Sequence, residues 1–137
     1  MSTMLDSVVT RQANAQDVPF IFSSWLKSYH NSNFALSIPS TMYFKEQHKL
    51  IEQIITRSTV LVAVNPEDQS QIYGWICADT AGAVPIIHYL YVKHPYRKFG
   101  LGRMLVDLIS TEPFIYTHDT GKKFTSGVYC PYMAFNK

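Results

Sequence analysis

The sequence predicts a single α/β domain in which helices flank a mixed sheet. Apolar residues recur at the three-to-four spacing of a buried helix face in the first half of the chain and again near residue 105. Between residues 59 and 92 the apolar residues instead form short runs that turn-forming residues separate, as strands do. The resulting order, βααβββαβ followed by a shortened C-terminal segment, indicates an α/β domain.

Length and composition agree with one globular domain. The chain has 137 residues, of which 47% are hydrophobic and 16% charged, and this balance argues against disorder. Its formal net charge is +2, which gives no reason to expect nucleic-acid or membrane affinity. We therefore expect neither nucleic acid nor a membrane among its partners.

Cysteine usage and the N-terminus lead us to expect a cytoplasmic protein. Cys77 and Cys130 form no CxxC or metal-ligand spacing, so reduced thiols and no metal site are expected. Asp6 follows the first five residues and leaves no apolar signal segment. No uncharged apolar run approaches the roughly 18–20 residues that a membrane-spanning helix needs.

The first half predicts one strand and two helices. Residues 5–11 form a candidate strand around Val8–Thr10, and Asn14 is placed to cap a helix with Asp17 at its third helical position, as in a variant capping box. The helix is expected to extend to Tyr29. After a polar loop, Ser40 or Thr41 can cap a second helix that runs to Arg57.

The second half predicts strands and one more helix. A turn cluster at 65–70 separates two apolar runs, which indicates a hairpin. A third helix follows a loop that carries two glycines. The strands are expected at residues 59–64, 72–78, 85–92 and 113–117, the helix at 102–110, and a candidate C-terminal strand at 128–132.

The segment from Leu90 to Leu105 carries the strongest functional signal. A strand ending at Val92, a basic turn, two glycines and a helix would direct backbone N–H groups and a positive helix end toward an anionic phosphate. Gly100 and Gly102 lack the Cβ atoms that would obstruct a ligand near the backbone. A Rossmann fingerprint would need a third glycine where Leu105 stands, and a P-loop would need lysine where Arg103 stands.

The segment Arg97-Lys98-Phe99-Gly100-Leu101-Gly102 resembles the Arg/Gln-x-x-Gly-x-Gly/Ala signature of the GCN5-related N-acetyltransferase (GNAT) family. The flanking strand end, Pro95, Tyr96 and Arg103 are also similar to family residues. The resemblance covers residues 5 to about 118. It implies a mostly antiparallel mixed sheet and acetyl-CoA as the acetyl donor. It also implies direct attack of an amine on the thioester, which lies in a V-shaped gap between the fourth and fifth strands.

The resemblance also implies which residues bind acetyl-CoA. The pyrophosphate would be bound by the loop from Arg97 to Gly102, with Arg103 just beyond it. The pantetheine arm would lie along the backbone at the end of the fourth strand. The implied cofactor-binding residues are Leu90, Tyr91, Val92, Arg97, Lys98, Phe99, Gly100, Leu101, Gly102 and Arg103.

Proton transfer needs groups that titrate or donate near the reacting atoms. Period-two alternation places Ile86, His88, Leu90 and Val92 on one strand face, with Ile87, Tyr89 and Tyr91 on the other. In aralkylamine acetyltransferases, which are similar here, a histidine four residues before the same valine helps to carry the proton away. His88 is thus a candidate for that role, and a buried structural histidine is the alternative. Residues 84–92 hold no carboxylate, although many family members carry a glutamate there.

Other catalytic candidates lie nearer the C-terminus. His118 belongs to a polar cluster after the fifth strand, which either faces the gap or forms a surface turn. The usual family acid is a tyrosine on a helix after that strand. Here only Tyr129 and Tyr132 follow, either as acid or as packing residues. For the acceptor pocket, the resemblance suggests a lining from the first helix and the loop after it: Trp25, Tyr29, His30, Asn33 and Phe34.

These observations predict an acetyl-CoA-dependent N-acetyltransferase that acts on a primary amine of a small molecule or a protein. The alternative is a non-catalytic binding or interaction protein of the same fold that retains a CoA site. The missing strand carboxylate and the missing helix tyrosine favour that alternative. The aromatic-rich tail is a candidate for completing a sheet between two copies of the chain.

Overall fold

The computed structural model describes residues 8–30, 40–97, 99–110, 113–118, 127–130 and 134. They form a six-stranded sheet in the order β1-β2-β3-β4-β5-β6. The first four strands pair antiparallel, whereas β5 runs parallel to β4 and β6 runs parallel to β5. The strands are β1 (Val9–Gln12), β2 (Thr59–Asn65), β3 (Asp68–Asp79), β4 (Ile86–Val92), β5 (Phe114–Tyr116) and β6 (Gly127–Tyr129).

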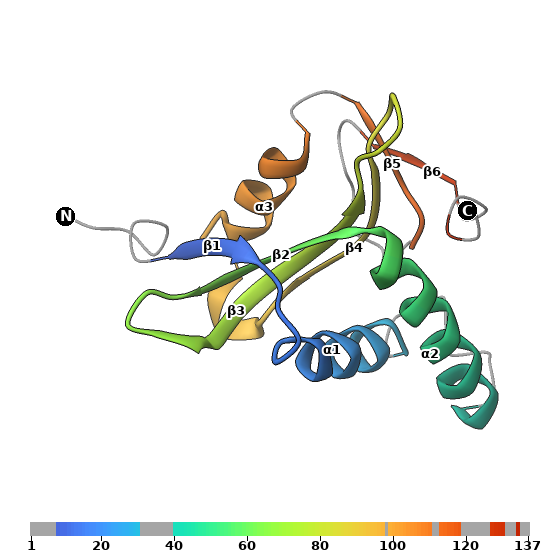
Figure 1. Cartoon of the computed structure of the whole chain (residues 1–137), viewed down its shortest axis with the longest axis horizontal. Helices are drawn as coiled ribbons and strands as arrows, with labels where there is room; N and C mark the ends of the chain where they lie inside the picture. Colours follow the sequence, from blue (N-terminus) through green and yellow to red (C-terminus); the bar gives the residue numbers. More distant parts are fainter. Residues whose placement is uncertain are drawn as a thin grey trace.

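Helices cover both faces of the sheet (Figure 1). The helices α1 (Val18–His30) and α2 (Ser40–Arg57) pack on one face, and α3 (Leu101–Ile109) packs on the other. Two hydrophobic clusters correspond to these layers. The first joins α1 and α2 to Trp75 and Tyr89, and the second joins Leu101 and Leu105 of α3 to Ile76. This arrangement confirms the predicted α/β class with a mixed, mostly antiparallel sheet.

The predicted elements occur with small shifts in their ends. The expected turn at 65–70 is shorter, because Asn65 already pairs with Asp68 and β3 begins there. The candidate strand 128–132 is β6, which ends at Tyr129 within the described residues. In α2 the Tyr43 side chain is buried, whereas Phe44 is more exposed. A short 3₁₀-helix at His94–Tyr96, which was not predicted, follows β4.

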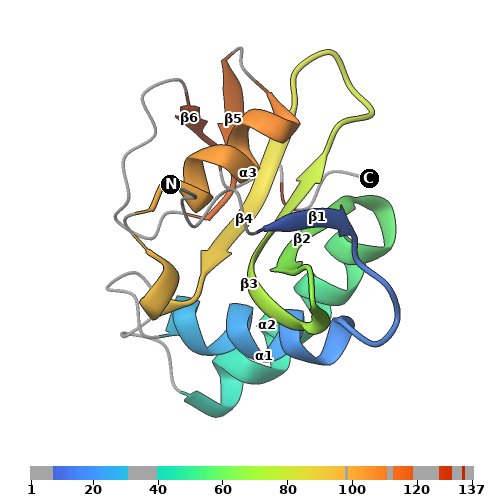
Figure 2. The ribbon, with the colours of Figure 1, turned by 90° about the vertical axis from the view of Figure 1, so that its left-hand side faces the viewer.

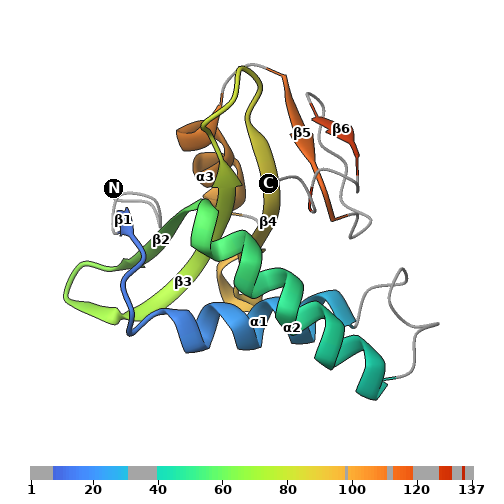
Figure 3. The same cartoon turned by 45° about the vertical axis from the view of Figure 1, so that its right-hand side comes forward.

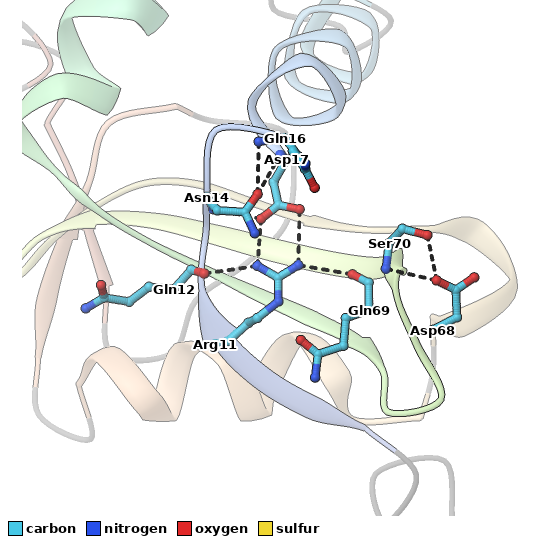
Figure 4. Close-up of polar contacts among 8 residues, drawn as sticks. All are labelled: Arg11, Gln12, Asn14, Gln16, Asp17, Asp68, Gln69 and Ser70. Atoms are coloured by element: carbon cyan, nitrogen blue, oxygen red, sulfur yellow. Dashed lines mark hydrogen bonds and ion pairs between the residues drawn. The ribbon is translucent and has the colours of Figure 1, made fainter.

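The predicted reciprocal hydrogen bonds between Asn14 and Asp17 precede α1 (Figure 4), but the helix begins at Val18, so Asp17 does not occupy its third position. The Asn14 side-chain oxygen accepts hydrogen bonds from the backbone N–H groups of Gln16 and Asp17, and the Asp17 carboxylate accepts one from the N–H of Asn14. The Arg11 guanidinium donates to both carboxylate oxygens of Asp17, at 2.7 and 3.2 Å, and to the carbonyl of Gln69 at 3.0 Å. One arginine therefore ties β1 to the helix start and to the β2–β3 hairpin.

Removal of that arginine is predicted to destabilise the fold. The hydrogen bonds from Arg11 hold the pKa of the buried Asp17 carboxyl below its ordinary value, so Arg11→Met leaves a buried carboxylate with fewer partners. We expect a loss of about 1–3 kcal/mol in the free energy of unfolding at pH 7, measured by urea denaturation. Because the pKa of Asp17 is lowered on folding, this stabilisation is present above the unfolded value of about 4 and fades as the pH falls below it.

Lys49→Met serves as the matched control, because it removes an exposed ion pair between Lys49 and Glu46, 3.7 Å apart on α2. Its expected effect is below about 0.5 kcal/mol. Equal effects of the two substitutions, or a difference between wild type and Arg11→Met that is constant from pH 7 to 3, would contradict this account.

Candidate functional site

The strand β4 contains a β-bulge at His88. Tyr89 pairs with Cys77 of β3, and Ile87 pairs with the next residue, Ala78, so His88 has no residue opposite it. The predicted alternation along β4 is therefore wrong at this point. Ile87 lies in the α3-side cluster with Leu90 and Val92, while Tyr89 packs on the α1–α2 side. A bulge bends its strand and increases the twist.

The strands β4 and β5 pair only over a short stretch. Ile86 pairs with Ile115 and Ile87 with Tyr116, and the N–H of Thr117 donates to the Ile87 carbonyl at 3.1 Å. Beyond this point the ribbons of β4 and β5 diverge (Figure 3). Residues His88 to Val92 of β4 therefore have no pairing partner on β5. A V-shaped gap between the two strands requires such an unpaired stretch.

The turn after β4 leads directly to the N-terminus of α3. Arg97 is exposed, and its Nε donates to the carbonyl of Val92 at 2.8 Å, which places the guanidinium at the end of β4. Gly100 is the N-cap of α3 with φ of 83°, a left-handed conformation that favours glycine. Having no side chain, Gly100 cannot cap the first N–H groups of the helix, which remain available to an anion.

The other residues of the loop have different surroundings. The Phe99 ring is half exposed, whereas the Leu101 side chain is buried in the α3-side core, so only its backbone can contact a ligand. A Cβ added at Gly102 would lie 3.5 Å from Leu90 Cδ2. That is an ordinary contact distance, so the packing of α3 on β4 does not require glycine here, and a role of both glycines in making room for a ligand stays a prediction. Lys98 lies outside the described residues.

Cationic side chains surround this end of β4. The Arg103 side chain is 83% exposed, and its contact with Asp107 is a long ion pair of 3.8 Å. The Lys93 ammonium lies 5.0 Å from the centre of the Phe20 ring. A groove of about 500 Å³ lies between α1 and the end of β4, and none of its described lining residues is acidic. Its lining residues are Phe20, Ser23, Ser24, Lys27, Ser28, Tyr91 and Arg97. Figure 2 shows α1 close to the end of β4 at which the strand leads into the turn.

The two predicted histidines are joined by one hydroxyl group. His88 Nδ1 lies 3.1 Å from Thr117 Oγ1, and His118 Nδ1 lies 3.0 Å from the same oxygen. All three residues are buried, with exposed fractions of 1% for His88, 3% for Thr117 and 8% for His118. Burial lowers the pKa of His88 to about 4 and that of His118 to about 3, so both rings are neutral at pH 7.

His118 extends this group of residues toward α2. Its Nε2 lies 3.0 Å from Nε2 of Gln47, and its ring packs edge-on against Trp25 and Tyr29. Of the two predicted settings, the surface turn is therefore wrong. Thr117 and His118 are buried and lie at the point where β4 and β5 diverge, and the other residues of the polar cluster lie outside the described residues. Gln47 was not predicted, since nothing in its helical sequence context distinguishes it from a solvent-facing residue.

Of the remaining candidates, Tyr129 lies apart from this group, whereas Trp25 and Tyr29 pack against His118. The Tyr129 ring is 44% exposed and packs against Tyr116, on the strand beyond β5. Tyr132, Asn33 and Phe34 lie outside the described residues, as does the side chain of His30. The Trp25 ring is fully buried against Trp75 and Tyr89, which excludes it from the surface of an acceptor pocket in this conformation.

Gly74 is a second residue that the sequence analysis did not single out. It pairs with Val92 across β3 and β4, and a Cβ there would lie 2.6 Å from the Tyr91 carbonyl oxygen. A side chain at this position would therefore displace the end of β4, where the loop to α3 begins. The signal in the sequence was a glycine inside a predicted strand, which often marks a close approach of two backbones.

The described residues include neither a metal-ligand cluster nor a membrane-spanning helix. Among the described residues, no cluster of three or more histidine, cysteine or acidic residues could hold a metal ion. No described helix combines the length and the apolar character needed to cross a bilayer.

No family model and no curated protein matches the sequence. Solved structures do match, and three of them illustrate the likeness. The apo form of YjaB from Escherichia coli has a TM-score of 0.54 and 22% identity over 74% of this chain and 63% of its own. A GNAT-family acetyltransferase from Staphylococcus aureus Mu50 has a TM-score of 0.53 and 17% identity over 74% and 62%, respectively.

The third structure is the PaiA N-acetyltransferase from Thermoplasma acidophilum in complex with coenzyme A. It has a TM-score of 0.54 and 16% identity over 74% of this chain and 69% of its own. The chain spans less than two thirds of the length of the first two structures. At these identities the likeness concerns the fold, and the chain has the fold that these acetyltransferases share.

The two loop glycines are predicted to respond differently to alanine. Gly100→Ala forces a side chain into the left-handed region and should lower the free energy of unfolding by about 1–2 kcal/mol. Gly102→Ala adds a methyl group at ordinary contact distance inside a helix, so its effect should range from zero to about 1 kcal/mol of stabilisation. Urea denaturation of both variants measures the difference. Equal destabilisation, or the reverse order, would show that the loop has another conformation.

Proposed function

Because the chain has the GNAT fold, we propose that it is an acetyl-CoA-dependent N-acetyltransferase that transfers an acetyl group directly to a primary amine of a small molecule or a protein. The observation that carries this proposal is the junction of β4 and α3. There, the signature segment that begins at Arg97 places an uncapped helix N-terminus beside the end of a strand whose pairing with β5 has already stopped.

The loop residues supply the binding groups for the donor. The N–H groups at the start of α3 suit a diphosphate, because they combine hydrogen-bond donors with the positive end of the helix. Arg97 and Arg103 add positive charge on the exposed side of the loop. The β4 backbone from His88 to Val92 offers hydrogen-bonding groups to the pantetheine arm, whose amides need such partners. Bound acetyl-CoA would supply the activated acetyl thioester.

The acceptor amine is proposed to approach from the α1 side. The groove between α1 and β4 runs beside Tyr91 and reaches Arg97, so it adjoins the proposed donor site. An attacking amine must be neutral, and its proton must be removed during the reaction. His88 is a titratable residue at the divergence of β4 and β5, and its Nε2 atom is buried without a hydrogen-bond partner among the described residues.

A cytoplasmic location is part of the proposal. Cys77 and Cys130 are both free thiols, as a reducing compartment allows. The second candidate function is a non-catalytic protein that binds CoA. It is favoured by the exposed position of Tyr129 and by the absence of a carboxylate from β4.

Acetyl-CoA binding is predicted to depend on the charge of the loop. Acetyl-CoA at one hundred times its dissociation constant should stabilise the protein by about 2.7 kcal/mol, which thermal unfolding detects readily. Arg103→Glu changes an exposed side chain and should weaken binding about tenfold, as measured by calorimetry, since one interaction with a phosphate becomes a repulsion. Lys49→Glu makes the same charge change on α2 and should leave the affinity unchanged.

A bulky residue in the loop provides a steric test of the same site. Gly100→Trp should abolish stabilisation by acetyl-CoA, whereas Leu108→Trp, at an exposed position on the same helix, should retain it. Loss of binding in both variants, or in neither, would place the donor site elsewhere.

Turnover separates the two candidate functions. Incubation with acetyl-CoA and a panel of primary amines, with free thiol followed over time, should show amine-dependent release of CoA. Binding of acetyl-CoA without turnover on any amine would favour the non-catalytic alternative, and no binding at all would contradict both.

A further inference from the structure

A chain of four hydrogen-bonded side chains links the β4 bulge to the edge of α2. His88 lies at the divergence of β4 and β5, Thr117 and His118 follow β5, and Gln47 lies on α2. The successive distances are 3.1 Å from His88 to Thr117, 3.0 Å from Thr117 to His118, and 3.0 Å from His118 to Gln47. The inner three residues are buried, whereas Gln47 is partly exposed.

The position of the Thr117 hydroxyl favours complementary states of the two rings. Each neutral imidazole carries a single N–H, and a hydroxyl group has a single proton to donate. Thr117 Oγ1 lies within hydrogen-bond distance of Nδ1 of both rings. When it donates to one Nδ1, it accepts an N–H from the other; when it donates to the His88 carbonyl, it can accept from both rings. Its distance to the His88 carbonyl is 3.4 Å, long for a hydroxyl donor, so the ring nitrogens are its better partners.

Two arrangements in which Thr117 donates to a ring nitrogen satisfy all three contacts. In the first, the His88 Nδ1–H donates to Thr117, Thr117 donates to His118 Nδ1, and the His118 Nε2–H donates to the Gln47 amide oxygen after a half-turn of that amide. In the second, every donor and acceptor is exchanged, and the Gln47 NH₂ donates to His118 Nε2, as the structure places it. His88 Nε2 is an acceptor in the first arrangement and carries a proton in the second.

We propose that these four side chains form a proton relay that conducts the proton of the acceptor amine from the β4–β5 divergence to solvent at the edge of α2. This inference rests on the proposed acetyltransferase function. His88 is its inner end, because Nε2 is buried without a partner among the described residues and an unpaired buried donor or acceptor is costly. Thr117 and His118 relay the proton from His88, and Gln47, which takes up no proton itself, positions His118.

The proton movement is balanced along the chain. The N–H bond of the amine breaks as a new N–H bond forms at His88 Nε2. The His88 Nδ1 proton moves to Thr117, the Thr117 hydroxyl proton moves to His118 Nδ1, and the His118 Nε2 proton passes to water beside Gln47. One proton enters and one leaves, so no net charge remains among buried groups.

The surroundings favour this neutral transfer over a protonated histidine. The charged groups that act on His88 are Arg57 at the end of α2 and Asp79 at the end of β3, with opposite effects on its pKa. His118 is enclosed by the rings of Trp25, Tyr29 and Tyr89, and His88 lowers its pKa further. A positive charge on either ring would lack a carboxylate in hydrogen-bond contact among the described residues.

The proton positions can be measured without any turnover. Long-range ¹H–¹⁵N NMR spectra at pH 7, with the rings assigned through His88→Gln and His118→Gln, report which nitrogen of each ring is protonated. We expect the two rings to carry their protons on opposite nitrogens, one on Nδ1 and the other on Nε2, and Thr117→Val to abolish this complementarity. The same protonated nitrogen in both rings of the wild type would overturn the relay.

Steady-state kinetics test whether the relay carries the proton during the reaction. Thr117→Val keeps the shape but removes the hydroxyl, and it should lower kcat about 10- to 100-fold with the KM for acetyl-CoA unchanged. Thr117→Ser restores the hydroxyl and should return kcat to within about threefold of wild type. Should Thr117→Val fold poorly by thermal unfolding, Gln47→Leu breaks the relay at its outer end and should also lower kcat.

The outcomes separate the relay from the proposed function. Wild-type turnover with full activity in both Thr117→Val and Gln47→Leu would overturn the relay and leave the acetyltransferase proposal intact. A wild-type protein with no turnover would overturn the proposed function and the use of the relay. In that case the NMR spectra still decide whether the hydrogen-bonded chain exists.

Discussion

The extra residue in β4 is the constraint on which the candidate site depends. Because His88 has no partner on β3, the strand changes phase there, and Ile87 and Tyr89 face opposite helical layers. The same bulge bends β4 at the point where its pairing with β5 ends. Without the extra residue, period-two alternation would place His88 on the face of Leu90. The bulge therefore accounts for the position of the buried histidine, whose Nδ1 lies beside the Thr117 hydroxyl.

The two ends of β4 are held by different interactions. At its N-terminal end, short parallel pairing with β5 fixes Thr117 beside Ile87. At its C-terminal end, the close approach of Gly74 and the bond from Arg97 to the Val92 carbonyl position the turn into α3. His88 thus lies on β4, four residues before Val92, where the strand ends and leads into the donor loop, and the groove beside α1 adjoins that end of the strand.

Local chemistry explains which parts of the structure were predictable. The start of α1 followed from Asn14 and Asp17, because a helix cap involves residues two or three positions apart. The αL turn at Gly100 and the order of the elements likewise depend on short-range patterns. The bulge at His88 was missed because alternation assumes one residue per pairing position, and an inserted residue leaves the apolar pattern of β4 intact. The bond between Gln47 and His118 joins residues 71 positions apart, so no local pattern could reveal it.

The central claim is that the start of α3 and the unpaired end of β4 together bind acetyl-CoA. Titration of the ¹⁵N-labelled protein with acetyl-CoA, followed through its backbone amide signals, tests this claim most directly. We predict that the largest shifts occur at Leu101, Gly102 and Arg103 and along β4 from His88 to Val92. Shifts confined to other elements, or no shifts at millimolar acetyl-CoA, would contradict it.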